Sequence, residues 1–88
     1  MADSQMVWQR IRAHDGQTFH TIRRLPFTYR VMGNYLITNR AQYNLARSNL
    51  EKALGRVPLS GPSEIKDLRG SSYVYAILMD ARIRGNDW

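Results

Sequence analysis

The sequence predicts a small α+β domain: an antiparallel β-meander of three to four strands, packed by one long helix and followed by a short C-terminal helical pair. Two observations support this. Between Met6 and Thr38 apolar and polar residues alternate, with turn residues at short intervals, as in strands. Beyond Asn39, apolar residues recur at helical spacing. At 88 residues the chain is expected to form a single domain, 1–88, with residues 1–5 as a loose N-terminal end.

The first strand is predicted over Met6–Ala13, because its apolar residues alternate with polar ones. His14–Gly16 then suits a three-residue hairpin loop closed by glycine. That loop would set Ile11 opposite Phe19, within a second strand over Gln17–Ile22.

The third strand is predicted over Phe27–Met32. Pro26 precedes it and ends the second strand, since proline cannot donate to a central ladder. Gly33–Asn34 forms a two-residue hairpin turn, because both residues accept positive φ. The turn sets Val31 opposite Leu36 and thereby extends one apolar face.

The long helix is predicted to begin at Asn39, whose side chain and that of Gln42 can form a capping box. Its apolar stripe suits packing across the sheet. The stripe consists of Tyr43, Ala46, Leu50, Ala53, Leu54 and Val57. Gly55 or Pro58 ends the helix, and Leu45 points away from the stripe.

A short helix over Glu64–Arg69, capped by Ser63, is expected next. The segment 72–83 is predicted to be a second helix from its apolar spacing, although a buried strand is the alternative for so continuous an apolar run. Its spaced residues are Val74, Ile77, Leu78 and Ala81. An irregular tail follows, with Trp88 packed back.

The charge favours an anionic partner. The chain holds 11 Arg and 2 Lys against seven acids, a formal net charge of +6. Arginine makes forked contacts to phosphate and guanine, although arginine usage can also reflect genome composition. The absence of cysteine, of a signal peptide and of an 18-residue apolar run predicts a cytoplasmic protein with no membrane span.

The segment 61–85 has the outline of a helix-turn-helix unit, with Gly70 at the turn. Arg69 and Arg82 would lie near phosphates, and other side chains would face the major groove. The groove-facing candidates are Ser71, Ser72, Tyr73, Tyr75 and Met79. Lys66, Arg69 and Ala76 depart from the pattern, and the alternative is that the pair completes the core.

A second candidate interface is the predicted sheet. Arg10, Arg12 and Trp8 would share one face of the first strand. Arg30 would lie on the face of the sheet opposite to that of Tyr29. Cationic and aromatic side chains interleaved on a sheet can neutralise phosphates and stack bases, as in single-strand binders. The alternative is an ordinary solvated face.

No catalytic constellation, metal site or cofactor motif is found. His14 and His20 have no partner placed by a motif, and the acids are scattered singly. Glu64–Lys66 matches part of a nuclease signature without its strand context. We therefore expect a protein that is not an enzyme, with no cofactor and no metal.

The surplus of large apolar residues predicts self-association, as a homodimer, through Trp8, Leu45 and Trp88. Two functions thus follow from the sequence. The first is non-catalytic nucleic acid binding, with duplex DNA favoured, in an accessory or regulatory role. The alternative is a self-associating protein-interaction module whose basic charge is incidental.

Overall fold

The chain folds into a four-stranded antiparallel sheet with helices packed on one side of it, as seen in a computed structural model that describes residues 3–41 and 44–88. Its elements in order are α1 (Ser4–Ala13), β1 (Thr18–His20), β2 (Pro26–Met32), β3 (Tyr35–Thr38), β4 (Asn44–Ala46), α2 (Arg47–Leu54), the 3₁₀ helix η1 (Pro62–Ile65), α3 (Ser71–Leu78) and α4 (Ala81–Arg84). The predicted α+β class is therefore confirmed.

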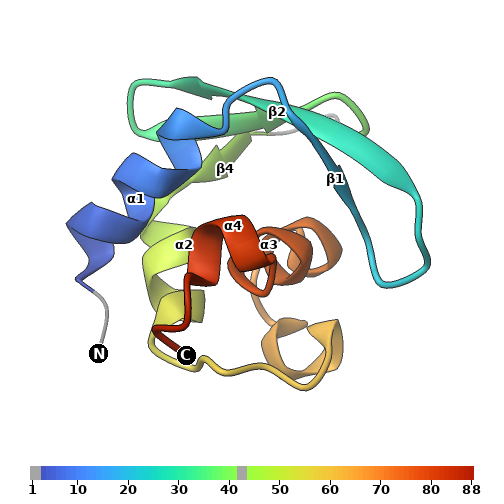
Figure 1. The fold of residues 1–88 in the computed structure, drawn as a ribbon. Helices are drawn as coiled ribbons and strands as arrows, with labels where there is room; N and C mark the ends of the chain where they lie inside the picture. Colours follow the sequence, from blue (N-terminus) through green and yellow to red (C-terminus); the bar gives the residue numbers. More distant parts are fainter. Residues whose placement is uncertain (1–2, 42–43) are drawn as a thin grey trace.

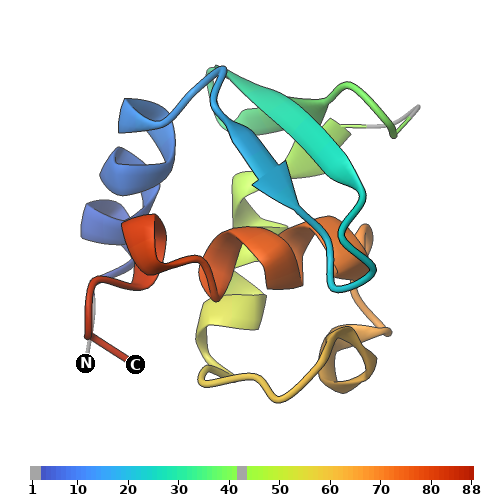
Figure 2. The same cartoon turned by 45° about the vertical axis from the view of Figure 1, so that its right-hand side comes forward.

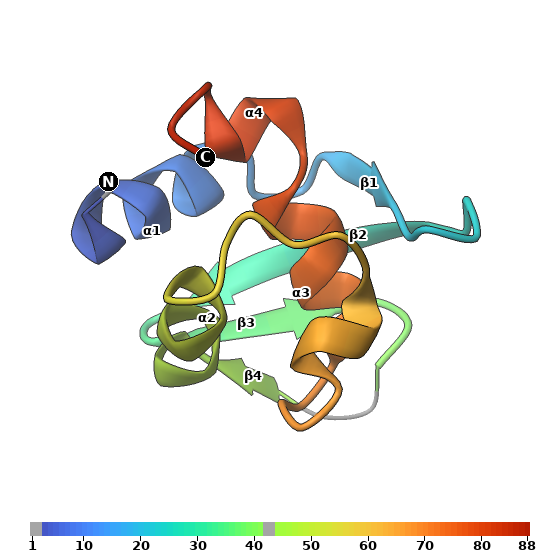
Figure 3. The ribbon, with the colours of Figure 1, turned by 90° about the horizontal axis from the view of Figure 1, so that it is seen from below.

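The strands follow the order β1-β2-β3-β4, so each pairs with its neighbour in the sequence. Helices α2, α3 and α4 lie below the sheet in Figure 1, and α1 lies beside them. The view from below shows α2 and α3 in front of the strands, with α1 and α4 to the side of them (Figure 3). The sheet therefore has one helix-covered face and one face without a helix among the described residues.

The prediction of a strand over Met6–Ala13 is wrong, because this segment is helix α1. The Asp3 side chain caps the helix by accepting from the Gln5 N–H at 2.9 Å. Val7, Trp8 and Ile11 are buried, a spacing of one and then three residues that falls on one side of a helix. Consequently Gln9, which a strand would have buried, faces solvent, and the helix already includes part of the expected loose end.

Since α1 is a helix, His14–Gly16 does not join two strands, and the predicted pairing of Ile11 with Phe19 is wrong. Strand β1 pairs with β2 instead, which sets Phe19 opposite Phe27. The second predicted hairpin is confirmed. Gly33–Asn34 turns the chain with Gly33 at φ +61°, and Val31 lies opposite Leu36.

The long helix begins later than predicted. Asn39 does not cap it; its Oδ1 accepts from the Thr28 N–H at 2.9 Å and so extends the β2–β3 pairing. The chain then forms β4, where Leu45 pairs with Leu36 and is fully buried, so the expectation that Leu45 points away from the core is wrong. Helix α2 is shorter than expected and ends before Gly55, as predicted. Gln42 and Tyr43 lie outside the described residues.

In the C-terminal part, the predicted helix over Glu64–Arg69 is replaced by the 3₁₀ turn η1 with no side-chain cap. The helical interpretation of 72–83 is confirmed, except that the helix is broken. Asp80 begins α4 by accepting from the Arg82 N–H at 2.9 Å. Trp88 packs back as predicted, donating from its indole N–H to the Leu78 carbonyl at 2.8 Å.

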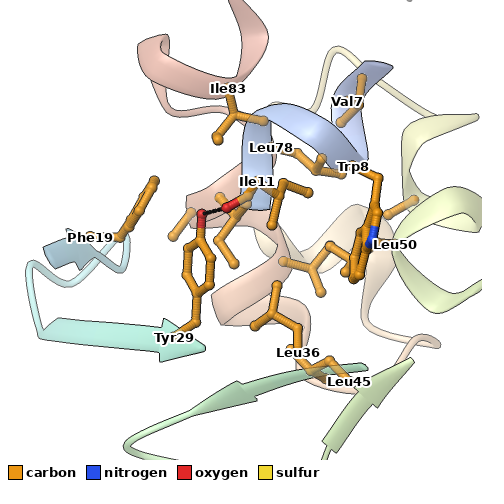
Figure 4. Close-up of a cluster of buried hydrophobic side chains, with 14 of the residues drawn as sticks. Val7, Trp8, Ile11, Phe19, Tyr29, Leu36, Leu45, Leu50, Leu78 and Ile83 are labelled. Atoms are coloured by element: carbon orange, nitrogen blue, oxygen red, sulfur yellow. Dashed lines mark hydrogen bonds between the residues drawn. The ribbon is translucent and has the colours of Figure 1, made fainter. Parts of the chain in front are cut away.

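The core lies between the sheet and the helices (Figure 4). Its one drawn hydrogen bond runs from the Tyr29 hydroxyl to the Ile11 carbonyl, at 2.6 Å, and joins β2 to the last turn of α1. Burial raises the pKa of Tyr29, so this hydroxyl keeps its proton. No helix in the described part of the chain is both long and apolar enough to cross a bilayer.

Candidate nucleic-acid interface

The segment with the helix-turn-helix outline forms part of the core. Its first helix is only the four residues of η1. Gly70 does sit at the turn, with φ +67°. The second helix, α3, buries Val74, Ala76, Ile77 and Leu78, which leaves it no broad exposed face. A recognition helix needs such a face to enter the major groove.

The side chains assigned to that unit are mostly used within the chain. Tyr73, Tyr75 and Met79 are half-buried, and the Tyr73 ring meets Phe27 edge-on at 5.1 Å between centroids. Of the two small polar candidates, Ser71 is half-buried and Ser72 is exposed.

Arg82 is held by several partners rather than extended toward a phosphate. Its guanidinium donates to Asp80, to Gln17 Oε1 and to the Thr18 carbonyl, each at 2.9–3.0 Å, and lies 3.9 Å from the Phe19 ring centroid. Burial acts to raise the pKa of Asp80, but the hydrogen bonds from the Arg82 side chain and backbone outweigh it and lower that pKa. Arg69 is exposed, and its backbone is held at both ends by the Asn49 amide.

The residues assigned to the first predicted strand separate on helix α1. Trp8 is buried, with the Arg47 guanidinium 5.5 Å from its ring. Arg12 is exposed. The expected cluster of Arg10, Arg12 and Trp8 on a sheet face is therefore wrong, and only Arg30 lies on the sheet as predicted.

Arg10 instead joins the two ends of the fold. Its Nη1 donates to the Ile83 carbonyl at 2.9 Å, and its Nη2 lies 2.6 Å from Asp87 Oδ2. A guanidinium placed at the last carbonyls of α4 also complements the helix dipole.

The face of the sheet away from the helices carries apolar, aromatic and cationic side chains. We call it the outer sheet face. It consists of His20 from β1, Arg30 and Met32 from β2, and Tyr35 and Ile37 from β3, with Arg40, just after β3, at its edge where β2 begins. These residues are exposed, while their neighbours along each strand, such as Phe19, Tyr29 and Leu36, are buried.

The pairing register of β2 and β3 brings the Arg30 cation and the Tyr35 ring close together on this face. Arg30 lies opposite Ile37, and Met32 lies opposite Tyr35. Arg30 and Tyr35 are thus diagonal neighbours, roughly 7–8 Å apart, a separation that long side chains span. Tyr35 is 51% exposed, so a large part of its side chain is open to a ligand.

A second cation lies farther along β2. Arg40 Nε donates to the Pro26 carbonyl at 2.5 Å, and Pro26 pairs with His20. Pro26 and Arg30 are four residues apart on one strand, about 13 Å. One cation, Arg30, therefore lies on the outer sheet face, and a second, Arg40, lies at the start of β2.

The stretch of chain that forms the sheet contains no acidic residue of its own. Residues 16–50, which include all four strands, hold five Arg and neither Asp nor Glu. Asp15, just before this stretch, reaches back to Arg30 with 3.0 Å between Oδ1 and Nε. Because the Arg30 side chain is 74% exposed, the pair is well solvated and stabilises little.

The residues predicted to mediate self-association do not lie on a free surface. Trp8 and Leu45 are 5% and 0% exposed and lie in the core of their own chain. Trp88 is half-buried and bonded to Leu78. The homodimer stays a prediction to which these side chains assign no contact surface.

The outer sheet face and its edge contain residues that the sequence did not assign to nucleic acid binding, namely His20, Met32, Tyr35, Ile37 and Arg40. The acid-free stretch 16–50 was a visible signal for them. The alternation in β3 was a second signal, since burying Leu36 exposes Tyr35 and Ile37.

Among the described residues there is no group of three side chains of the His, Cys, Asp and Glu types placed to hold a metal ion. His14 Nδ1 lies 2.8 Å from the Arg10 carbonyl at the end of α1, where it helps to close the helix. Comparison with protein-family models, curated proteins and solved structures finds no match to the chain.

Proposed function

We propose that the protein is a non-catalytic nucleic-acid-binding protein that holds a single strand on its outer sheet face. The observation that carries the proposal is the exposed Tyr35 ring beside Arg30, on a face that no helix in the described part of the chain covers, within an acid-free stretch of 35 residues, 16–50. Aromatic rings that stack bases, together with cations that follow the backbone, are the usual means of binding single strands.

The geometry favours a single strand over a duplex. The duplex hypothesis depended on α3 as a recognition helix, and α3 is largely buried. Tyr35 and Ile37 stand on a pleated surface, where an unpaired base can lie flat against a ring. A base inside a duplex has both faces stacked on its neighbours and offers none to Tyr35.

The test is fluorescence anisotropy with a labelled 12-nucleotide strand and the matching duplex. We expect the single strand to bind more tightly, and Tyr35→Ala to weaken its binding about 5- to 150-fold, since one stacked base contributes roughly 1–3 kcal/mol. Tyr35→Phe, which keeps the ring, should bind like the wild type.

Charge is tested by the double variant Arg30→Ala/Arg40→Ala against Arg12→Ala/Lys66→Ala. Both remove two exposed cations, but only the first pair lies on the outer sheet face or at its edge. We expect the first double variant to lose most of its binding and the second to keep it. Equal effects, or a preference for the duplex, would count against the proposed site.

The second candidate, a self-associating module, is supported by the exposed Met32 next to Tyr35 and Ile37. The charge argues against twofold pairing of this face, because two copies would bring their Arg30 and Arg40 side chains together. Sedimentation at tens of micromolar decides between them: a species near twice 10.2 kDa that persists at low salt favours the module, and a monomer favours strand binding.

A further inference from the structure

A groove lies beyond the outer sheet face, under the β1–β2 hairpin. We call it the hairpin groove. It has a volume of about 630 Å³ and runs between the hairpin loop, η1 and the start of α3. Its lining includes Ile22, Arg23, Leu25, Pro62, Ser72 and Tyr73. This volume is within the range of about 300–1,000 Å³ typical of small-ligand sites. Figure 2 shows the loop of the hairpin reaching toward α3.

The hairpin loop is fixed, so the exposure of its apolar side chains does not come from a loose segment. The Thr21 N–H donates to the Leu25 carbonyl at 3.0 Å, and the Leu25 N–H donates to Thr21 Oγ1 at 3.2 Å. The Arg24 N–H donates to the Thr21 carbonyl at 2.7 Å. Ile22 and Leu25 are nevertheless about half exposed, and both line the groove.

The opposite wall is aromatic. Tyr73 is held by its edge-on contact with Phe27, and it lines the groove, as does Pro62. Ser72 adds a hydroxyl at the same wall. The groove thus combines apolar and aromatic side chains with hydroxyl-bearing residues, Ser63 and Ser72 among them, which suits a flat ring bearing hydrogen-bonding atoms.

The groove carries positive charge. Arg23 lines it, and none of its described lining residues is acidic. A groove of about 500 Å³ elsewhere, lined by Trp88, includes Glu51 and Asp87 and would repel an anion. The hairpin groove therefore selects a ligand that joins a flat apolar part to a negative charge, as a nucleotide does.

The hairpin groove lies on the helix side of the sheet, and the base of the hairpin connects it to the outer sheet face (Figure 1). The hairpin begins at the pair His20 and Pro26, and Arg40 is bonded to that same Pro26. A nucleic acid strand that follows the cations from Arg30 to Arg40 reaches the base of the hairpin, and it must pass around the hairpin to reach Arg23 on the helix side.

We propose that the hairpin groove receives one unstacked nucleotide of the bound strand, with its base between Leu25 and Tyr73 and its phosphate beside Arg23. This inference rests on the proposed function for the continuity of the strand, whereas the groove itself can be tested with free mononucleotides.

The experiment is a titration followed by amide chemical shifts, using deoxyadenosine monophosphate and, in parallel, deoxyadenosine. We expect the monophosphate to shift the amides of Ile22, Leu25 and Tyr73, and the nucleoside to bind at least fivefold more weakly. Arg23→Ala should remove that difference. Ile22→Ser/Leu25→Ser should abolish the shifts and weaken the 12-nucleotide strand about tenfold, while Ala13→Ser, an exposed change on α1, should do neither.

The outcomes separate the two proposals. If Tyr35→Ala weakens binding of the 12-nucleotide strand but Ile22→Ser/Leu25→Ser leaves its affinity unchanged, the groove proposal is overturned and the proposed function stands. Mononucleotide shifts in the groove, with no strand bound by the wild type, would overturn the function and support the groove. Tighter binding there by a peptide of alternating Asp and Leu than by the mononucleotide would also overturn the inference.

Discussion

Gly70 is the residue at which a single methyl group should do most harm. It has φ +67°, and a Cβ there would lie 2.6 Å from Leu45 Cδ2, in the core under β4. Left-handed backbone costs other residues about 1–2 kcal/mol, and the clash adds a similar amount. We expect Gly70→Ala to lower the free energy of unfolding by about 2–4 kcal/mol in urea denaturation.

Gly33→Ala is the matched control. Gly33 also has positive φ, at +61°, but no atom lies within 4 Å of the added Cβ. We expect a loss of about 1–2 kcal/mol, due to the backbone alone. Equal losses at the two positions would show that Leu45 moves aside without cost.

Asp80 should make stability depend on pH. Since its folded pKa is lowered, the carboxylate stabilises the fold fully above the unfolded value of about 3.9, and this contribution is lost as pH falls through the folded pKa. We expect Asp80→Asn, which can still cap α4, to be less stable than the wild type at pH 6. The urea midpoints of the two proteins should converge toward pH 2.5.

The pKa values of Glu64 and Asp67 are lowered as well, so the wild type alone will also lose stability in acid. The informative quantity is the difference between the two proteins. A difference that stays constant from pH 6 to pH 2.5 would mean that the Asp80 charge does not stabilise the fold.

At the scale of elements, the sequence predicted the β2–β3 hairpin well and α1 badly. The hairpin is specified locally, because Gly33–Asn34 fixes the turn and the turn fixes the register. In α1 the same apolar residues fit both periods: Val7 and Ile11 are four apart, which suits a helix and also one side of a strand. Trp8 and the Asp3 cap decide for the helix, and a buried tryptophan beside Val7 is inconsistent with alternation.

The late start of α2 has a tertiary cause. Residues 44–46 lie at the beginning of a helical apolar stripe, yet they form β4, because this sets Leu45 opposite Leu36 in the core. No local feature of the sequence shows that β3, which pairs with β2 on one side, needs residues 44–46 as its partner on the other side. Element boundaries set by pairing between strands are therefore the part that single-sequence reasoning misses. The candidate site, in contrast, was accessible from the sequence, because the β2–β3 register that the turn fixes already places Arg30 and Tyr35 on the face opposite Tyr29 and Leu36.

Arg10 should be the main polar link between α1 and α4. Its guanidinium satisfies the last carbonyls of α4 and pairs with Asp87. We expect Arg10→Ala to cost about 2 kcal/mol, because charged hydrogen bonds are lost and carbonyls are left unpaired. Arg12→Ala, two residues away and exposed, should change stability by less than about 0.5 kcal/mol. Thermal melts of both variants test this, and similar melting temperatures would contradict it.

At the scale of the whole molecule, the affinity for single-stranded nucleic acid should fall with salt concentration, with a slope set by the number of phosphates neutralised. If Arg23, Arg30 and Arg40 each neutralise one phosphate, the logarithm of the affinity should fall with the logarithm of salt with a slope of about −2. Arg30→Ala/Arg40→Ala should reduce the slope by about 1.4. Anisotropy titrations between 50 and 300 mM salt measure both values, and a slope near zero would indicate that the strand is not held by these cations.

The Arg10 link also has a consequence for the order of folding. Every strand pairs with its neighbour in the sequence, whereas Arg10 bonds to Ile83, 73 residues away. Closing so long a loop before the sheet exists is entropically costly, so the sheet should form first and α1 should dock on α4 last. Arg10→Ala should therefore speed unfolding in stopped-flow measurements while leaving the refolding rate nearly unchanged, and Gly33→Ala in the hairpin should mainly slow refolding.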